Sequence, residues 1–122
     1  MTYDTGMLIA LERRKPRAMA IHQWLLEEES LRVLVPWAVV VEFWRGRSDR
    51  REKVLESVEV ELPTLSLAKI AGEALAAVRG STLVDAIVMS SAASRGDVVY
   101  TSDIDDLTRL QTYFPSVRVL GI

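Results

Sequence analysis

Residues 34–46 read LVPWAVVVEFWRG, an apolar run that ends in a single carboxylate, Glu42. Every residue from Val33 to Val41 is apolar. We expect the run to start as a strand, to reach Pro36, and to continue as a helix that carries Glu42 within about two turns of its start. An embedded carboxylate costs several kcal/mol of desolvation unless a cation or hydrogen bonds compensate its charge. The stretch therefore predicts a positively charged partner for Glu42.

Three aspartates repeat this arrangement elsewhere in the chain. Asp4 follows Thr2-Tyr3, Asp85 lies in the stretch TLVDAIVM, and Asp103 follows DVVYTS. In each case a carboxylate adjoins an apolar stretch that is typical of regular secondary structure. The pattern suggests that four negative groups share one cation.

The length and composition indicate one folded domain, residues 1–122. A chain of this size buries a proper core without disulfides or structural metals. Hydrophobic residues make up 49% of it, which excludes the polar composition of a disordered chain. The chain has no cysteine and one histidine, His22. A disulfide framework, a thiolate metal site and a zinc site built on imidazoles within one chain are therefore excluded.

Nothing in the sequence predicts membrane association. No apolar run approaches the ~20 residues needed to cross a bilayer, and the first apolar run lacks a basic leader. We expect a cytoplasmic protein.

The charge of the chain is nearly balanced. A formal net charge of −2 provides no overall attraction to nucleic acid, so binding of a polyanion must depend on local basic clusters. Two clusters exist: Arg13, Arg14, Lys15 and Arg17 form the first, and Arg45, Arg47, Arg50, Arg51 and Lys53 form the second. Solvated helix ends or loops are an equally good explanation of both, because Lys and Arg favour helix C-termini.

Aromatic and imidazole side chains at helical spacing are expected to pack against the core. This prediction applies to Trp24, Trp37 and Trp44, with contacts to a partner protein as the alternative. His22 borders the apolar face of a predicted helix, and we interpret it as a packed residue rather than a catalyst.

Helical and strand patterns alternate along the chain. Pro16 is expected to end the first helix, and the helix at 81–94 is apolar all round, which predicts burial on all sides. The predicted strands are 2–3, 32–35, 58–62 (at a sheet edge), 98–101 and 117–120. The predicted helices are 7–14, 17–29, one from Pro36 through Glu42, 50–57, 66–79, 81–94 and 107–114.

This alternation predicts an α/β domain with a mainly parallel sheet and helices on both faces. In such sheets ligands bind beyond the carboxyl ends of the strands. Asp4 and Asp103 both fall at such ends.

Most of the acids also have a purely structural interpretation. Asp4 and Asp103 could cap helices, and Thr82-x-x-Asp85 resembles a capping box. Asp105 and Asp106 could merely complement a helix dipole. Glu42 has no comparable alternative.

Taken together, the acids point to metal chemistry. Carboxylates gathered at one rim of a sheet repel one another and raise each other's pKa unless a hard cation neutralises them. Carboxylates without His or Cys suit Mg²⁺ or Mn²⁺. Such ions can activate water and stabilise charge on a phosphodiester during displacement.

Four motifs occur along the chain in a fixed order. They are Asp4-Thr5-Gly6 with Leu8-Ile9-Ala10, then Glu42, then Val84-Asp85-Ala86 with Ile87, and finally Tyr100-Thr101-Ser102-Asp103-Ile104-Asp105-Asp106-Leu107. Through their order, spacing and coverage the whole chain resembles the PIN-domain ribonucleases, specifically the small VapC-like toxins of bacterial toxin-antitoxin pairs. Gly6 departs from the pattern, since many relatives have Ser there.

The resemblance implies a three-layer α/β/α sandwich and an acidic Mg²⁺ or Mn²⁺ site that cleaves RNA. By position, the catalytic and metal-site acids would be Asp4, Glu42, Asp85 and Asp103, with Asp105 as an auxiliary acid, Asp106 as a weaker candidate and Thr101 as a polar neighbour.

The arginines just beyond Glu42 are further candidates. We suggest that Arg45 and Arg47 contact substrate phosphate, because Arg offers a bidentate fork to phosphate oxygens.

The resemblance also implies partners: an RNA substrate, an inhibitory antitoxin and a second copy of the chain in a homodimer. Two alternatives remain open at this stage. One is a PIN-like module that binds partners without catalysis. The other is a Mg²⁺-binding receiver-type signalling domain, which needs a lysine after a late strand that this chain lacks.

Overall fold

Five short strands form one parallel sheet in the order β3-β2-β1-β4-β5. The computed structural model describes residues 1–122. The strands are Thr2–Tyr3 (β1), Leu34–Pro36 (β2), Glu59–Glu61 (β3), Val98–Thr101 (β4) and Arg118–Gly121 (β5). The predicted parallel α/β sheet is confirmed, with β3 at an edge as expected. This order differs from the 2-1-3-4-5 order of receiver-type sheets, which removes the structural basis for that alternative.

Seven helices connect the strands. They are Thr5–Glu12 (α1), Pro16–Glu27 (α2), Trp37–Phe43 (α3), Asp49–Glu56 (α4), Leu65–Ala77 (α5), Leu83–Arg95 (α6) and Ile104–Gln111 (α7). The helices α1 and α2 lead from β1 to β2, α3 and α4 lead to β3, α5 and α6 lead to β4, and α7 leads to β5.

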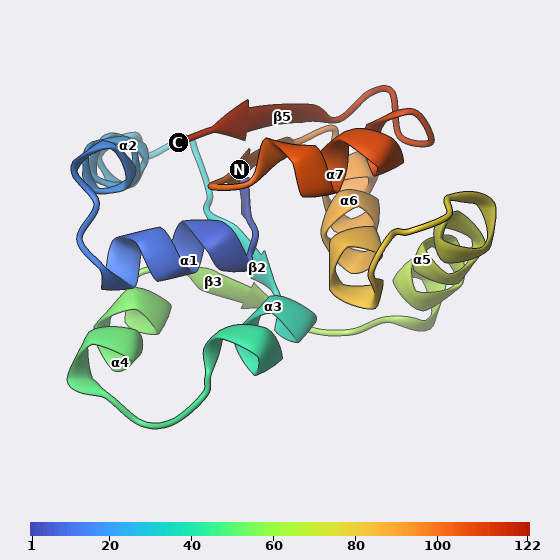
Figure 1. Cartoon of the computed structure of the whole chain (residues 1–122). Coiled ribbons are helices and arrows are strands. Elements are labelled where there is room, and N and C mark those ends of the chain that lie inside the picture. The colour runs from blue at the N-terminus through green and yellow to red at the C-terminus, as the bar shows by residue number, and fades with distance from the viewer.

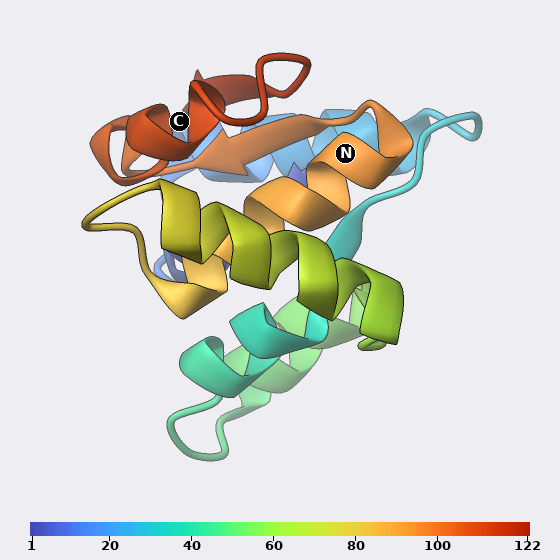
Figure 2. The same ribbon diagram turned by 90° about the vertical axis from the view of Figure 1, so that its right-hand side faces the viewer.

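The connections run in opposite directions from the central strand β1. The chain moves outward to β2 and β3, then crosses back past β1 to β4 and β5. Because crossovers between parallel strands are right-handed, the two groups of helices cover opposite faces. Figure 1 shows α1 and α4 on one side of the strands and α6 and α5 on the other. Figure 2 shows α5 lying over α6 as an outer helix.

This reversal has a geometric consequence for ligand binding. The connections that leave β1 and β4 diverge to opposite faces of the sheet. In open parallel sheets the divergence leaves a crevice at the carboxyl ends of the two strands, which is where ligands bind.

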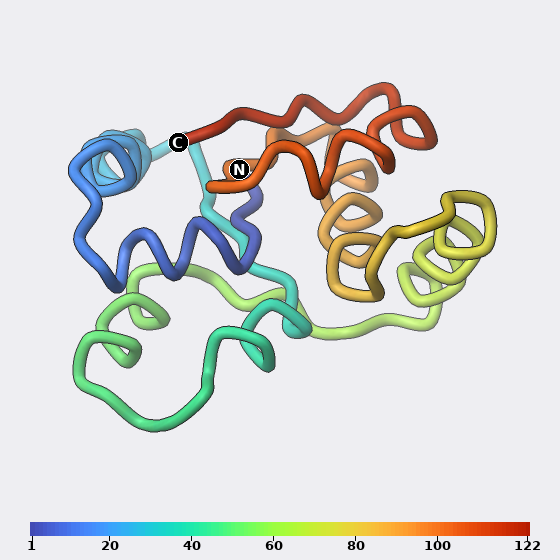
Figure 3. The backbone as a smooth tube through the Cα atoms, viewed as in Figure 1, coloured from blue at the N-terminus to red at the C-terminus, as the bar shows by residue number.

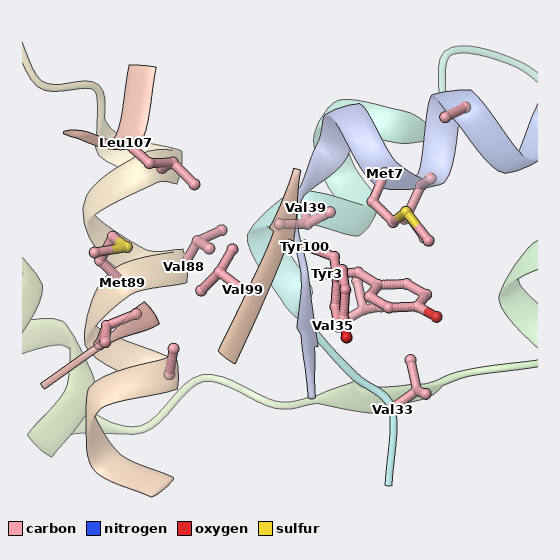
Figure 4. Packing of buried hydrophobic residues seen from close by; sticks show 14 of the residues in the cluster. Tyr3, Met7, Val33, Val35, Val39, Val88, Met89, Val99, Tyr100 and Leu107 are labelled. Atoms are coloured by element: carbon pink, nitrogen blue, oxygen red, sulfur yellow. The ribbon is translucent and has the colours of Figure 1, made fainter. Parts of the chain in front are cut away.

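The hydrophobic core lies on both sides of the central strands (Figure 4). Tyr3 and Met7 lie on one side, and Val88, Met89 and Leu107 lie on the other, all of them fully buried. Fully burying a large side chain contributes about 1.5–3 kcal/mol. This packing therefore holds together strands that are too short to form many ladder hydrogen bonds.

The single histidine is part of the core, as the sequence predicted. His22 is 8% exposed, and its Nδ1 lies 2.8 Å from the Tyr3 hydroxyl. Its Nε2 lies 2.8 Å from Ser57 Oγ, which itself donates to the Val54 carbonyl at 2.6 Å. Nε2 therefore donates to Ser57 and Nδ1 accepts from Tyr3, which is the neutral imidazole. Burial lowers the pKa of His22, in agreement with this assignment.

Two of the three tryptophans contradict the expectation of core packing. Trp24 is 52% exposed and Trp37 is 38% exposed, whereas Trp44 is half-buried. The helix α2 instead buries Ala18, His22 and Leu25, a stripe rotated away from Trp24. The polar partners of His22 make this rotation favourable, and they belong to distant parts of the chain.

The prediction that Glu42 is embedded beside a positively charged partner is also wrong. The apolar run divides between β2 and the short helix α3, so Val35 and Val39 are buried while Val41 is 66% exposed. Glu42 lies on the outer side of α3 and is exposed, and no Lys or Arg forms an ion pair with its carboxylate. The apolar residues form an unbroken run in the sequence because the buried strand β2 is followed directly by the helix α3.

Smaller corrections concern element ends. Pro16 does not end the first helix; it opens α2 at the first helical position, where its missing N–H costs nothing. The last helix begins at Ile104 rather than Leu107. The helix α6 is not buried on all sides, because Leu83 in its first turn is 61% exposed.

A polar network joins α6 to the sheet. Arg95 forms an ion pair with Glu61 of β3 and donates at 2.8 Å to the hydroxyls of Thr2 and Ser91. Its Nε also lies 3.5 Å from Asp97. The side chains of Arg95 and Glu61 are only 23% and 19% exposed. Mostly buried charges need such partners, so this network supports the packing of α6.

We predict that Arg95→Met lowers the free energy of unfolding by about 3 kcal/mol, because Glu61 then loses its ion-pair partner in a poorly solvated place. Asp97 keeps its ion pair with the N-terminus of Met1 at 2.9 Å. Arg32→Met is the matched control. Arg32 forms an ion pair with Glu59, which lies in β3 like Glu61, but the side chains of Arg32 and Glu59 are 67% and 53% exposed. Such surface ion pairs contribute at most about 1 kcal/mol. Urea denaturation measures both variants, and equal losses would contradict the prediction.

Candidate active site

The site begins where β1 and β4 end side by side. Asp4 follows β1 and is only 8% exposed. Its Oδ1 accepts the Met7 N–H at 2.9 Å, so Asp4 caps α1. Its Oδ2 accepts the Thr101 hydroxyl of β4 at 2.5 Å. The capping role and the position in the crevice thus belong to the same side chain.

Thr101 connects the two acids that follow the strands. Its hydroxyl oxygen accepts the Asp103 N–H at 2.9 Å while its proton goes to Asp4. Thr101 is fully buried, so this geometry is protected from water. One side chain therefore sets the position of Asp4 relative to the backbone of Asp103.

Glu42 reaches the site from α3. Its Oε1 accepts the hydroxyl of Thr5 at 2.5 Å, and Thr5 is the residue directly after Asp4. This hydrogen bond brings the carboxylate of α3 to the start of α1, across 37 residues of sequence.

Asp85 approaches from the first turn of α6. Thr82 caps this helix by accepting the Asp85 N–H at 3.2 Å. Asp85 is half-buried, and the negative charges of Asp106, Glu42 and Asp103 all act on it. Thr82 thus provides one half of the capping box expected from the sequence.

Three exposed acids occupy the start of α7. Asp103 stands at the N-cap position but makes no side-chain capping bond, so its carboxylate is available. Burial first, and then the Asp103 carboxylate, raises the pKa of Asp106. The negative charge of Asp106 also raises the pKa of Asp85.

The electrostatics show the cost of gathering these acids. Burial raises the pKa of Asp4 to about 6, against the lowering effect of Thr101 and Met7, and Asp85 and Glu42 raise it further. Burial and the neighbouring carboxylates likewise raise the pKa of Asp85. Both shifts have burial as their main cause, with repulsion between the carboxylates as a further contribution.

The site fits a hard divalent cation by its donors and its charge. The available donors are carboxylate and hydroxyl oxygens, which suit Mg²⁺ or Mn²⁺. Neither Asp4 nor Glu42 nor Asp85 forms an ion pair with a basic side chain. In the present side-chain arrangement no group of three acidic or histidine residues forms a ready-made metal site.

Of the two arginines proposed from the sequence as phosphate contacts, only Arg45 lies beside Glu42 in a cavity. Arg45 lines a cavity of about 240 Å³ beside Glu42, and its Nε donates to the Glu42 carbonyl at 3.2 Å. Arg47 is exposed in the loop between α3 and α4, with no hydrogen bond or ion pair.

Comparison with known families identifies the fold. The family model of the PIN domain matches residues 1–112. This chain belongs to the PIN-domain family. The PIN-domain match spans the motifs that contain Asp4, Glu42, Asp85 and Asp103.

Solved structures share this PIN fold along almost the whole chain. A chain of a toxin–antitoxin complex from Klebsiella pneumoniae has a TM-score of 0.73 at 17% identity, covering 99% of this chain and 98% of its own. A chain of VapBC2 from Rickettsia felis, bound to a promoter DNA fragment, has a TM-score of 0.73 at 14% identity, covering 100% of this chain and 99% of its own. A chain of DNA-bound VapBC from Salmonella typhimurium has a TM-score of 0.74 at 20% identity, covering 98% of this chain and 96% of its own. Comparison with curated proteins finds no significant match.

Sequence reasoning missed the residue that orients Glu42. Thr5 was part of a motif but had no assigned role, although a hydroxyl directly after Asp4 was a usable signal. None of the helices combines the length and the apolar composition that a membrane span requires.

The raised pKa of Asp4 leads to a prediction about stability and pH. The folded carboxyl loses its proton near pH 6 and the unfolded one near its ordinary value of 3.8. The folded state therefore binds more protons between these values, and stability falls as pH rises through this range. We expect the metal-free protein to lose about 2 kcal/mol between about pH 4 and about pH 6 relative to Asp4→Asn, out of about 3 kcal/mol over the whole transition at 1.36 kcal/mol per pKa unit.

Asp4→Asn is a suitable reference because Asn can still accept the Met7 N–H and has no charge. Urea denaturation in EDTA across this pH range measures the difference. Parallel stability curves for the two proteins would contradict the prediction.

Proposed function

We propose that this PIN-domain protein is a metal-dependent endoribonuclease that hydrolyses RNA phosphodiester bonds and acts as the toxin of a toxin–antitoxin pair. The observation that carries the proposal is the convergence of Asp4, Glu42 and Asp85 from three elements. Burial first, and then the charges of Asp85 and Glu42, raise the pKa of Asp4 there. Such an arrangement is unfavourable for stability, and binding of a cation would offset its cost.

Under this proposal Asp4, Asp85, Asp103 and Glu42 would hold Mg²⁺ or Mn²⁺. The α7 acids Asp105 and Asp106 would be auxiliary ligands. A bound divalent cation stabilises charge on the phosphoryl oxygens and lowers the pKa of a coordinated water. The carboxylates provide the negative charge that retains the cation and the acceptor oxygens that orient water.

The chain's own residues would then position the reacting groups. Two hydrogen bonds hold Asp4, from Met7 and Thr101, which limits its rotation. The hydroxyl of Thr5 holds Glu42, an exposed carboxylate that is free to orient the attacking water or accept its proton. Arg45, beside Glu42, is proposed to contact the scissile phosphate, and Arg47 is the less favoured second candidate.

The partners follow from the structural relatives. Chains of the same fold occur in complexes described as toxin–antitoxin and VapBC, two of them bound to DNA. These complexes support a proteinaceous antitoxin for this chain. We extend the proposal to a homodimer and, because RNA is the substrate, to action in the cytoplasm.

The first test is cleavage of RNA in the presence of Mg²⁺ or Mn²⁺. We expect Asp4→Asn and Asp85→Asn each to lower the rate at least about 100-fold, because loss of several kcal/mol of charge stabilisation corresponds to that factor. EDTA should stop cleavage by the unchanged protein.

Glu73→Gln is the matched control, since Glu73 is an exposed acid on α5, outside the site. It should cleave RNA at the unchanged rate. Cleavage by both aspartate variants at that same rate would overturn the assignment of the site.

A second test follows the metal without any turnover. Adding Mn²⁺ or Mg²⁺ at 100 times its Kd should raise the free energy of unfolding by about 2.7 kcal/mol, because the ion binds the folded state only. Thermal unfolding with and without metal measures this change. The double variant Asp4→Asn, Asp85→Asn should show no shift, and an equal shift in it would place the ion elsewhere.

A further inference from the structure

A second cleft adjoins the acidic site. It has a volume of about 460 Å³ and lies between α1, the start of α2 and the end of the chain. Its lining includes Gly6 and Ser102 at one end, and Arg13, Lys15 and Arg17 toward the other. This basic cleft, as we call it, contains three members of the first basic cluster of the sequence.

The inner end of the basic cleft lies against the catalytic acids. Gly6 is two residues after Asp4, and Ser102 stands between Thr101 and Asp103. A Cβ on Gly6 would lie 3.4 Å from Asp4 Oδ1 and would overlap the Ser102 hydroxyl. Only glycine therefore fits there without a rearrangement, and the basic cleft and the acidic site are continuous at this point.

The cations of the basic cleft are free. Arg13, Lys15 and Arg17 are exposed and form no ion pair, and no carboxylate side chain lines the cleft. Lys15 is the N-cap residue of α2 and makes no side-chain capping bond. No ion pair within the protein neutralises this charge.

The second basic cluster is different. Arg51 forms an ion pair with Glu12 at 3.1 Å and donates to the Gly46 carbonyl at 2.7 Å. Arg45 donates to the Glu42 carbonyl. Arg45, Arg50 and Arg51 also share their cavity with the carboxylates of Glu12 and Glu42, whereas no acidic side chain lines the basic cleft. The first cluster therefore offers a ligand a cleft with basic side chains only.

We propose that the basic cleft binds backbone phosphates of a single RNA strand next to the phosphodiester at the acidic site, an inference that rests on the proposed ribonuclease function. The acids repel a polyanion and the net charge of −2 provides no compensating field, so affinity must come from cations nearby. Arg and Lys that neutralise phosphates supply such affinity. The cleft thereby orients the strand: one flank of the cleaved bond runs over Ser102 toward Lys15 and Arg17.

The test is the double variant Lys15→Gln, Arg17→Gln. Arg13 is left unchanged because it also lines the cavity beside Glu42. The control is Lys69→Gln, Arg79→Gln, which removes the same charge from exposed positions on and just after α5. The backbone path in Figure 3 shows α2 and α5 at opposite ends of the molecule.

Binding of a fluorescent single-stranded RNA of about 12 nucleotides is measured in EDTA, so that no strand is cut. We expect the cleft variant to bind about 10-fold more weakly and its slope of log K against log salt to decrease by about 1.4, at about 0.7 per phosphate contact. The control variant should match the unchanged protein in both quantities. With metal, the KM for RNA should rise in the cleft variant alone.

Because the binding assay needs no turnover, its result is separable from that of the acid variants. Weaker binding by the cleft variant alone supports the inference even if the protein cleaves nothing. Equal affinity and salt slope in both double variants overturn it even if Asp4→Asn abolishes cleavage. Unchanged RNA binding combined with weaker binding of an acidic antitoxin segment also overturns it and assigns the cleft to a protein partner.

Discussion

The hydrogen bond from the Thr101 hydroxyl to the Asp4 carboxylate is the contact on which the site depends. It joins the ends of β1 and β4, two strands nearly 100 positions apart in sequence that become neighbours only in the sheet. The same hydroxyl accepts the Asp103 N–H, so the turn into α7 is placed by the same atom. Because Thr101 is fully buried, water does not compete for these bonds. Asp4, Thr101 and the backbone of Asp103 are therefore joined in one hydrogen-bonded unit.

That unit is held against electrostatic opposition. Burial and neighbouring carboxylates raise the pKa of Asp4 and Asp85, which means that folding carries an unfavourable term at neutral pH. Contacts elsewhere offset it, including the packing around Val88 and Met89 and the partly buried network of Arg95. The unfavourable electrostatic free energy at this rim of the sheet is consistent with a site that becomes more stable when it binds a cation. The basic cleft beside it would solve the complementary problem of attracting a polyanion to an acidic surface.

Local patterns predicted most of the secondary structure but not which faces would be buried. Helical spacing located α2, yet Trp24 faces solvent because His22 finds buried partners in Tyr3 and Ser57. Similarly, Glu42 was singled out as an embedded charge, and it is exposed. Glu42 lies near the other acids because its carboxylate accepts a hydrogen bond from the hydroxyl of Thr5. A periodic pattern identifies an apolar stripe, whereas burial depends on what packs against it.

The sequence alone determined the alternation of strands and helices, the strand-end positions of Asp4 and Asp103, and the family motifs, because these depend on neighbours along the chain. The sheet order, the divergence of the connections around β1, and the hydrogen bonds that hold the carboxylates in place depended on the tertiary structure. They arise from contacts between residues tens of positions apart, such as Thr5 with Glu42 and Thr101 with Asp4. The choice between the two basic clusters has the same origin. Both read alike as runs of Arg and Lys, and only packing shows that Arg51 is paired while Lys15 and Arg17 are free.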